Sequence, residues 1–149
     1  MHRYTFPCAL VALGLGLALH ALPAKAGDLY VEVTGLEGPD GAVNAILYDS
    51  KDGFGLPVHA IARVQAKPRD GKLRFALGNL PEGRYALVGF HDLNRDDMID
   101  RDAQGRPTEV YGFSNGAKIA PGAKRPDFDA ASVHVPAEGR AETRIPLAK

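Results

Sequence analysis

The sequence predicts an all-β fold, a single antiparallel β-sandwich of seven or eight short strands with a long acidic loop. Hydrophobic residues alternate with polar ones in several short runs, and this period of two is typical of strands that bury one face. Turn-forming residues separate the runs at intervals of about eight to twelve residues, as in sandwiches and barrels. After residue 26 we find no amphipathic stretch long enough for a helix of ten or more residues.

The first 26 residues are typical of a cleavable export signal. An apolar run covers 9–22, and Ala24 and Ala26 match the A-x-A pattern that signal peptidase reads. The run is about 14 residues long, shorter than the roughly 20 residues of a permanent membrane-spanning helix. We therefore expect a signal peptide at 1–26 and a periplasmic or secreted domain at 27–149, with no stable membrane span after cleavage. The alternatives are an uncleaved anchor and a lipoprotein, and Cys8 precedes the apolar run, which disfavours lipidation.

Charge and cysteine content restrict the function of the expected mature domain. Removing residues 1–26 leaves 16 basic and 18 acidic residues, a net charge of −2. Nonspecific nucleic-acid binding needs a clear basic excess, so we expect no nucleic-acid partner. Cys8 is the only cysteine of the sequence, so the mature domain forms no disulfide. Its stability must come from its core, with a bound ion as a further contributor.

The first half of the domain is expected to contain four strands. The clearest alternation is found in two runs, with apolar positions at Leu29, Val31 and Val33 and at Leu73, Phe75 and Leu77. Two further strands are predicted between them at 42–49 and 60–66, bounded by segments rich in glycine, proline and aspartate. We expect the second alternating run to face a core shared with Tyr85 and Leu87.

The second half combines short strands with long irregular segments. A strand is predicted at 84–90, followed by a loop at 92–107 that is rich in Asp, Asn, Arg and Gly. Later elements are an apolar island at 111–113, one helical turn within 126–132, and strands at 133–135 and 141–147. Five aromatic residues in this half belong either to the core or to a ligand groove: Tyr85, Phe90, Tyr111, Phe113 and Phe128.

Oxygen-bearing side chains recur at alternate positions of the acidic loop. They occupy the first, third, fifth and ninth places of the segment that begins at residue 92, and the seventh place offers a backbone carbonyl. Calcium takes about six to eight oxygen ligands at about 2.3–2.6 Å, and this spacing lets one loop surround the ion. The predicted calcium ligands are Asp92, Asn94, Asp96, Met98 and Asp100, with Glu109 completing the shell from the following segment.

The loop departs from the helix–loop–helix calcium pattern at two places. Asp97 stands at the sixth place, where those loops have glycine, and Ala103 stands at the twelfth, where they have a bidentate carboxylate. These departures predict weak binding. The alternative interpretation is a solvated acidic loop whose charge is balanced by Arg95, Arg101 and Arg106.

Two other motifs invite a catalytic interpretation. His91 adjoins the acidic loop, where it is either a metal ligand or general base, or a histidine packed at the end of a strand; we favour the packed histidine. The segment 112–116 matches G-x-S-x-G around Ser114, but a nucleophile elbow needs a strand before the turn and a helix after it. No helix is expected there, so we interpret Ser114 as part of a backbone turn.

Four segments resemble a family of exported bacterial proteins, the domain-of-unknown-function family 2141. They are Leu80–Leu87, His91–Asn94 closing with Ile99–Asp100, Glu109–Asn115, and Arg125–Ala131. The resemblance extends over about 41–147 and implies export and a sandwich fold, without an established activity. Members usually carry Asn-Gly where this chain has Asp96-Asp97. The Leu-Pro-x-Gly-x-Tyr step at 80–85 is also similar to the strand entry of transthyretin-like and collagen-adhesin B-type sandwiches, which is an analogy of fold.

Together these features predict an exported, non-catalytic binding or structural module with a calcium site in its acidic loop. The alternative function is a metal-dependent hydrolase or lectin-like carbohydrate-binding protein that uses the acidic loop, with Asp92, Asp96, Glu109 and His91 around the metal. A deep pocket joining His91 to Glu109 would favour the alternative. The sequence does not specify the ligand, the partner or the oligomeric state.

Overall fold

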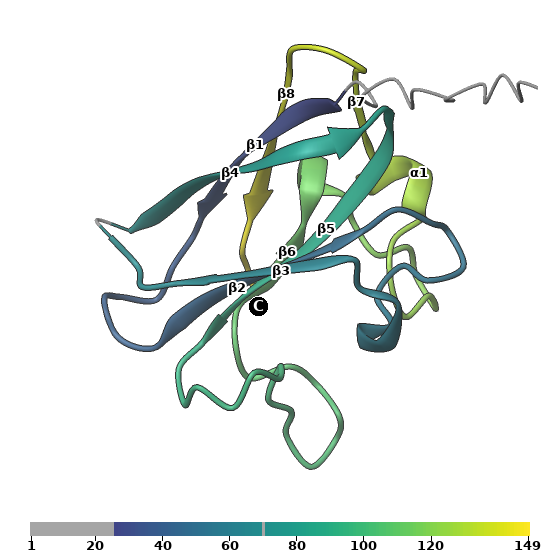
Figure 1. Cartoon of the computed structure of the whole chain (residues 1–149). Coiled ribbons are helices and arrows are strands. Elements are labelled where there is room, and N and C mark those ends of the chain that lie inside the picture. Colours follow the sequence, from purple (N-terminus) through teal and green to yellow (C-terminus); the bar gives the residue numbers. More distant parts are fainter. Residues whose placement is uncertain (1–25, 70) are drawn as a thin grey trace, which may run out of the picture.

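The computed structural model describes residues 26–69 and 71–149 as two packed β-sheets (Figure 1). The described residues contain eight strands, which confirms the predicted all-β, sandwich-like fold. Apart from Ala26, the predicted signal peptide lies outside the described residues.

Three strands form the first sheet, which we call sheet A. Its order is β4 (Lys72–Pro81), β1 (Ala26–Thr34) and β8 (Arg140–Pro146). Strand β1 is antiparallel to β4 but parallel to β8. The prediction of a purely antiparallel sandwich is therefore wrong for this one pair.

The parallel pair arises because the chain changes sheets just before β8. Strand β7 (Val133–Val135) pairs with the second sheet, and the chain then turns through 136–139 to reach sheet A. The Asp28 backbone N–H donates to the Gly139 carbonyl at 3.0 Å, so β8 starts beside the start of β1. The crossing is close, since a Cβ on Gly27 would lie 2.4 Å from the Pro136 carbonyl oxygen.

The second sheet, sheet B, is antiparallel throughout. Strand β5 pairs with β2 from Ala86 to Asp92, with β6 near its C-terminal end and with β7 near its N-terminal end. The strands of sheet B, besides β7, are β3 (Ala62–Ala66), β2 (Ala42–Tyr48), β5 (Gly83–Asp92) and β6 (Tyr111–Phe113).

Helical structure in the described residues is limited to single turns. They are the 3₁₀ turns η1 (Pro57–His59) and η2 (Ser114–Gly116) and the helix α1 (Phe128–Ala131), which confirms the turn predicted within 126–132. Within 26–69 and 71–149, no helix has the length and apolar character needed to cross a membrane.

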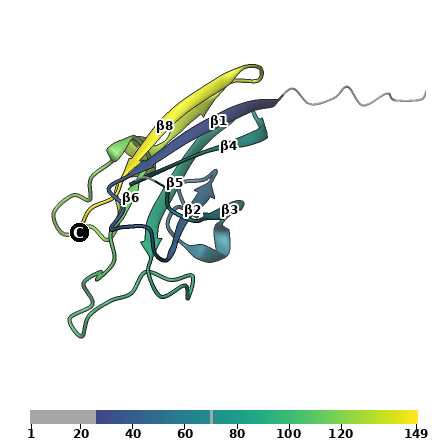
Figure 2. The same ribbon diagram turned by 90° about the vertical axis from the view of Figure 1, so that its left-hand side faces the viewer.

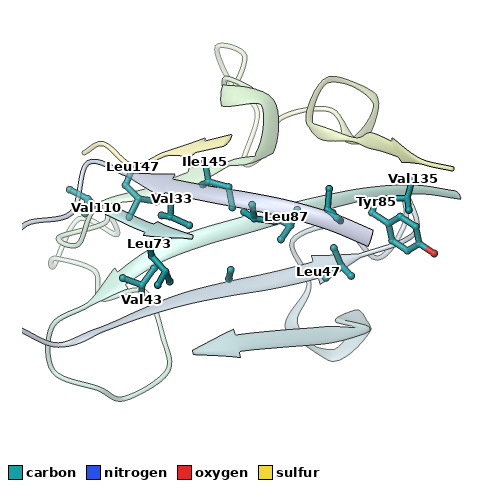
Figure 3. Close-up of a cluster of buried hydrophobic side chains, with 13 residues drawn as sticks. Val33, Val43, Leu47, Leu73, Tyr85, Leu87, Val110, Val135, Ile145 and Leu147 are labelled. Atoms are coloured by element: carbon teal, nitrogen blue, oxygen red, sulfur yellow. The ribbon is translucent and has the colours of Figure 1, made fainter. Parts of the chain in front are cut away.

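The main core fills the space between the two sheets (Figure 3). Leu29, Val31 and Val33 of β1 are buried there, as their alternation predicts. Leu73 is also buried, and Phe75 and Leu77 of β4 pack partly buried against the same cluster. The predicted core shared with Tyr85 and Leu87 is therefore confirmed.

A second core covers the outer face of sheet B, the face turned away from sheet A. There Phe54 makes edge-to-face contacts with Tyr48, Phe113 and Phe128, at ring-centroid distances of 5.7, 6.0 and 5.8 Å. This layer explains why β2 and nearly all of β5 are buried on both faces. Phe90, Phe113 and Phe128 are core residues of this cluster, Tyr111 packs partly buried against it, and Tyr85 belongs to the main core.

Candidate metal centre in the acidic loop

The acidic loop connects β5 to β6 and begins at Asp92, the last residue of β5. It projects from the end of the sandwich where β5 ends (Figure 1). Its first part folds against β3, because the Gln65 side-chain amide donates to Asp97 Oδ1 at 2.6 Å and Arg63 Nη1 donates to the Asp97 carbonyl at 3.4 Å. The sequence alone does not predict these strand residues as partners of the loop.

The Asp92 carboxylate is fully buried and organises the first turn of the loop. Its Oδ1 accepts hydrogen bonds from the backbone N–H groups of Arg95 at 2.6 Å and Asp96 at 3.3 Å, and its Oδ2 accepts from Asp97 N–H at 2.9 Å. The Asn44 side-chain amide, also buried, adds a fourth bond at 3.2 Å. Asp92 therefore holds the chain in a tight curl, because a carboxylate that accepts several N–H groups fixes their positions.

The turn at the sixth place forms without glycine. Asp97 has φ = 65° and Arg95, two residues earlier, has φ = 63°, both in the left-handed region. Aspartate is one of the few non-glycine residues that enter this region with some ease. Asp97 therefore adopts the left-handed conformation that a glycine would adopt more easily, at a cost in backbone strain.

Three predicted ligands come together on the exposed side of the curl. The Asn94 side-chain nitrogen lies 3.1 Å from Asp96 Oδ2 and 3.1 Å from Asp100 Oδ2. The Asn94 side-chain oxygen accepts from Asp96 N–H at 3.2 Å. An amide nitrogen thus bridges two carboxylates that would otherwise repel each other.

Met98 and Glu109 are placed differently from this group of three. The Met98 side chain is exposed, and its backbone N–H donates to Asp96 Oδ1 at 2.9 Å. Glu109 is buried, and its two carboxylate oxygens accept from the N–H groups of Leu93 at 2.7 Å and Asp100 at 3.2 Å. Glu109 therefore ties together two places in the loop that are seven residues apart in the sequence.

Across the described residues, no three His, Cys, Asp or Glu side chains are grouped so that they would hold a metal ion. The six predicted ligands divide instead into two buried braces, Asp92 and Glu109, and an exposed group. That group is the amide of Asn94 and the carboxylates of Asp96 and Asp100, together with the main chain at Met98. The carboxylates of Asp96 and Asp100 and the carbonyl groups of Asn94 and Met98 can supply oxygen ligands, which suit a hard cation such as calcium.

The second part of the loop, at 102–106, forms a turn that is closed by an ion pair between Asp102 and Arg106. Asp102 accepts from the backbone N–H groups of Gln104 and Arg106, both at 2.9 Å, and from Arg106 Nε at 2.8 Å. The Arg106 backbone N–H is the main cause that lowers the pKa of Asp102, against the opposing effect of partial burial. This turn supports part of the alternative interpretation, since Arg106 does balance an acidic residue of the loop.

His91 is packed inside the sandwich. Its Nδ1 accepts from Glu37 N–H at 3.0 Å, so the ring proton resides on Nε2, which donates to the Asp40 carbonyl at 2.7 Å. Both ring nitrogens therefore hold the connection between β1 and β2. This environment fits the interpretation of His91 as a packed histidine.

Ser114 is buried at the start of η2 and joins three parts of the chain. Its hydroxyl accepts from Leu87 N–H at 2.8 Å and donates to the Ala131 carbonyl at 2.6 Å. Neither partner is a base, so nothing here would activate the hydroxyl as a nucleophile. The G-x-S-x-G match thus marks a structural serine.

A family model described as an uncharacterised protein conserved in bacteria, DUF2141, matches residues 31–144. The chain belongs to this family. Neither a curated protein nor a solved structure matched it.

The segments that carry the DUF2141 resemblance make contacts that hold the fold together. The Tyr85 hydroxyl donates to the Pro81 carbonyl at 2.8 Å and so closes the turn before β5. Arg84 donates to the Ser132 hydroxyl through Nε at 3.0 Å, and Asn115 donates to the Ser132 carbonyl at 2.9 Å. These bonds fasten η2 and the end of α1 to β5 in this DUF2141 chain.

Proposed function

We propose that this protein is an exported, non-catalytic binding or structural module whose acidic loop binds one calcium ion. The observation that carries the proposal is the meeting of the Asn94, Asp96 and Asp100 side chains within 3.1 Å contacts on the exposed side of the loop. The proposed place of action is the periplasm or the outside of the cell, where extracellular modules bind calcium with dissociation constants of about 10⁻⁴–10⁻³ M.

The ion would replace the Asn94 amide nitrogen between the two carboxylates. A half-turn of this amide exchanges its nitrogen for its oxygen, so three side-chain oxygens then surround one point. The Asp96 N–H would lose its bond to the Asn94 oxygen in this rearrangement and keep its bond to Asp92 Oδ1. The Met98 carbonyl and water are the proposed further ligands, because calcium needs about six to eight oxygens. Asp92 and Glu109 support the site by holding the backbone, with their carboxylates already bonded to N–H groups.

The environments of His91 and Ser114 support a non-catalytic module over a hydrolase. A general base needs a free nitrogen within reach of the substrate proton, and both nitrogens of His91 are bonded to backbone groups in the interior. A serine nucleophile needs an adjacent base, and Ser114 contacts only backbone groups.

Thermal melts with chelator and with calcium test the loop site. The expected result is a higher melting temperature in calcium, because binding to the folded state alone stabilises it by about 1.4 kcal/mol at ten times Kd. Asp96→Ala and Asp100→Ala should each abolish this shift, because each removes one converging carboxylate. Asp127→Ala, which removes an exposed carboxylate outside the loop, should retain it.

Two results would count against the calcium site. One is a parent protein whose melting temperature does not change at calcium concentrations well above a millimolar Kd. The other is an equal calcium shift in the parent and in both loop variants, which would assign the effect to a different part of the protein.

A further inference from the structure

The solvent-facing side of sheet A carries a hollow of about 660 Å³. Strands β4, β1 and β8 lie side by side in one layer (Figure 2). Their register places the outward side chains in cross-strand rows. One row is Arg74–Glu32–Arg144, and the next is Ala76–Tyr30–Glu142. These six residues line the hollow together with the residues between them, Val31, Phe75 and Thr143.

Two arginines share one carboxylate in the first row. Arg74 Nε donates to Glu32 Oε2 at 2.6 Å, and its Nη2 contacts the same oxygen. Arg144 Nε donates to Glu32 Oε1 at 2.9 Å. Glu32 is mostly covered, whereas the two arginine side chains are each 69% exposed.

This row therefore keeps one positive charge uncompensated. The two guanidinium groups are held on either side of Glu32, and each has further N–H donors that these bonds do not use. The hydrogen bond from Arg74 is the main cause that lowers the pKa of Glu32, so the carboxylate stays charged and keeps both arginines in position. Guanidinium groups fixed in this way suit a planar carboxylate, which they bind with paired hydrogen bonds.

The second row offers a surface for a hydroxylated ring. Tyr30 is 43% exposed, and its neighbour Ala76 is small, so one side of the tyrosine ring has room beside it. Arg140 lies over the Tyr30 ring at 5.9 Å from the centroid and pairs with Glu142 at 3.5 Å. An exposed aromatic ring packs against apolar C–H surface, and Glu142 can accept hydrogen bonds from hydroxyl groups.

From these two rows we propose that the outer face of sheet A binds an acidic saccharide, a sugar ring that bears a carboxylate. The carboxylate would bind Arg74 and Arg144, and the ring would lie on Tyr30 with its hydroxyl groups toward Glu142. A chain of phosphates fits less well, because Glu32 and Glu142 would repel successive negative charges along the groove. The proposal specifies a ligand for the binding module proposed above, but it does not require calcium in the acidic loop.

Titration calorimetry with trigalacturonate as the probe, in buffer with chelator, tests this site independently of calcium. We expect binding that is weaker by about tenfold in Arg144→Gln, which loses charged hydrogen bonds to the ligand. Tyr30→Ala should also weaken it, and neutral galactotriose should bind less tightly than the acid. Arg95→Gln, a matched change on the acidic loop, should bind like the parent. Cooperative melts with midpoints well above the temperature of the titration would verify that the variants are folded, although Arg144→Gln also loses its bond to Glu32.

Several outcomes would overturn the proposal. One is the absence of binding heat and of NMR shifts in β1 and β8 at millimolar trigalacturonate. Another is equal weakening by Arg144→Gln and Arg95→Gln, which would make the effect one of general charge. Equal affinity for a triglutamate peptide would show that the face takes carboxylates without recognising a sugar ring.

Discussion

Buried polar side chains in this protein serve mainly to hold backbone groups. Asp92, Glu109, His91 and Ser114 are each buried, and each bonds at least two main-chain groups. A buried polar atom without a partner is costly, so such residues fix the local path of the chain. The residue types that suggested chemistry in the sequence therefore have structural roles at these positions.

Spacing in the sequence identified the loop residues but not the direction of their side chains. The alternate oxygens at 92–100 predicted one group around one point, and Asn94, Asp96 and Asp100 do meet. The orientation of Asp92 depends on backbone N–H groups and on Asn44, which lies 48 residues away in the sequence. One feature of the sequence indicates a special role for Asn44: it is the polar residue of an otherwise apolar strand.

Asp92→Ala should destabilise the protein even without calcium. It leaves the N–H groups of Arg95 and Asp97 and the Asn44 amide without this acceptor, and loss of a buried acceptor typically costs about 1–3 kcal/mol. Asp96→Ala removes an exposed carboxylate and should cost about 0.5 kcal/mol or less in the same buffer. Urea unfolding of both variants in chelator measures the difference. Equal free energies of unfolding for the two variants would contradict the bracing role of Asp92.

At the scale of strands, alternation predicted which side chains face the core but not every pairing. Leu73, Phe75 and Leu77 could be assigned to the core because side chains on a strand point to opposite faces in turn. The parallel pairing of β8 with β1 could not be predicted, because it depends on the change of sheet at 136–139. The burial of β2 and β5 on both faces has a similar origin, since distant segments at 54 and 113–131 cover them.

Sheet A should lose stability in acid through Glu32, which links all three of its strands. The hydrogen bond from Arg74 is the largest cause of a pKa below the usual 4.5, and Arg144 lowers it further. Because the folded state holds this proton less tightly than the unfolded chain, the stabilisation is present above pH 4.5 and is lost as the pH falls through the lowered pKa.

Melting temperatures recorded from about pH 6 to pH 2 measure this dependence. Glu32→Gln should show a shallower fall in acid than the parent, with some dependence remaining because the pKa of Asp102 is also lowered. Glu142→Gln, which changes an exposed carboxylate on the same face, should keep the slope of the parent. If both variants flattened the curve equally, the acid sensitivity would not depend on the bridging position of Glu32.

At the scale of the whole molecule, the proposed cleavage site lies at the start of β1. Ala26 pairs with Pro81 and Gly27 pairs with Leu80, so the proposed cleavage after Ala26 would remove a single residue of the strand. The rest of the register with β4 and β8 would remain, because Gly27 still lies beneath the turn at 136–139. We therefore expect the exported form to have the same fold as the described residues.

Intact-mass measurement of protein recovered from the periplasm or the medium should give the mass of residues 27–149. The expectation depends on the apolar run at 9–22 and on the small residues Ala24 and Ala26, which match a peptidase site. Ala24→Arg, a bulky charged residue at a position that needs a small one, should leave the precursor uncleaved. Ala21→Leu lies inside the apolar run and serves as the control, because it keeps both small residues. Full-length parent protein in the membrane fraction would instead favour the uncleaved anchor, since the apolar run would then still be attached to the folded domain.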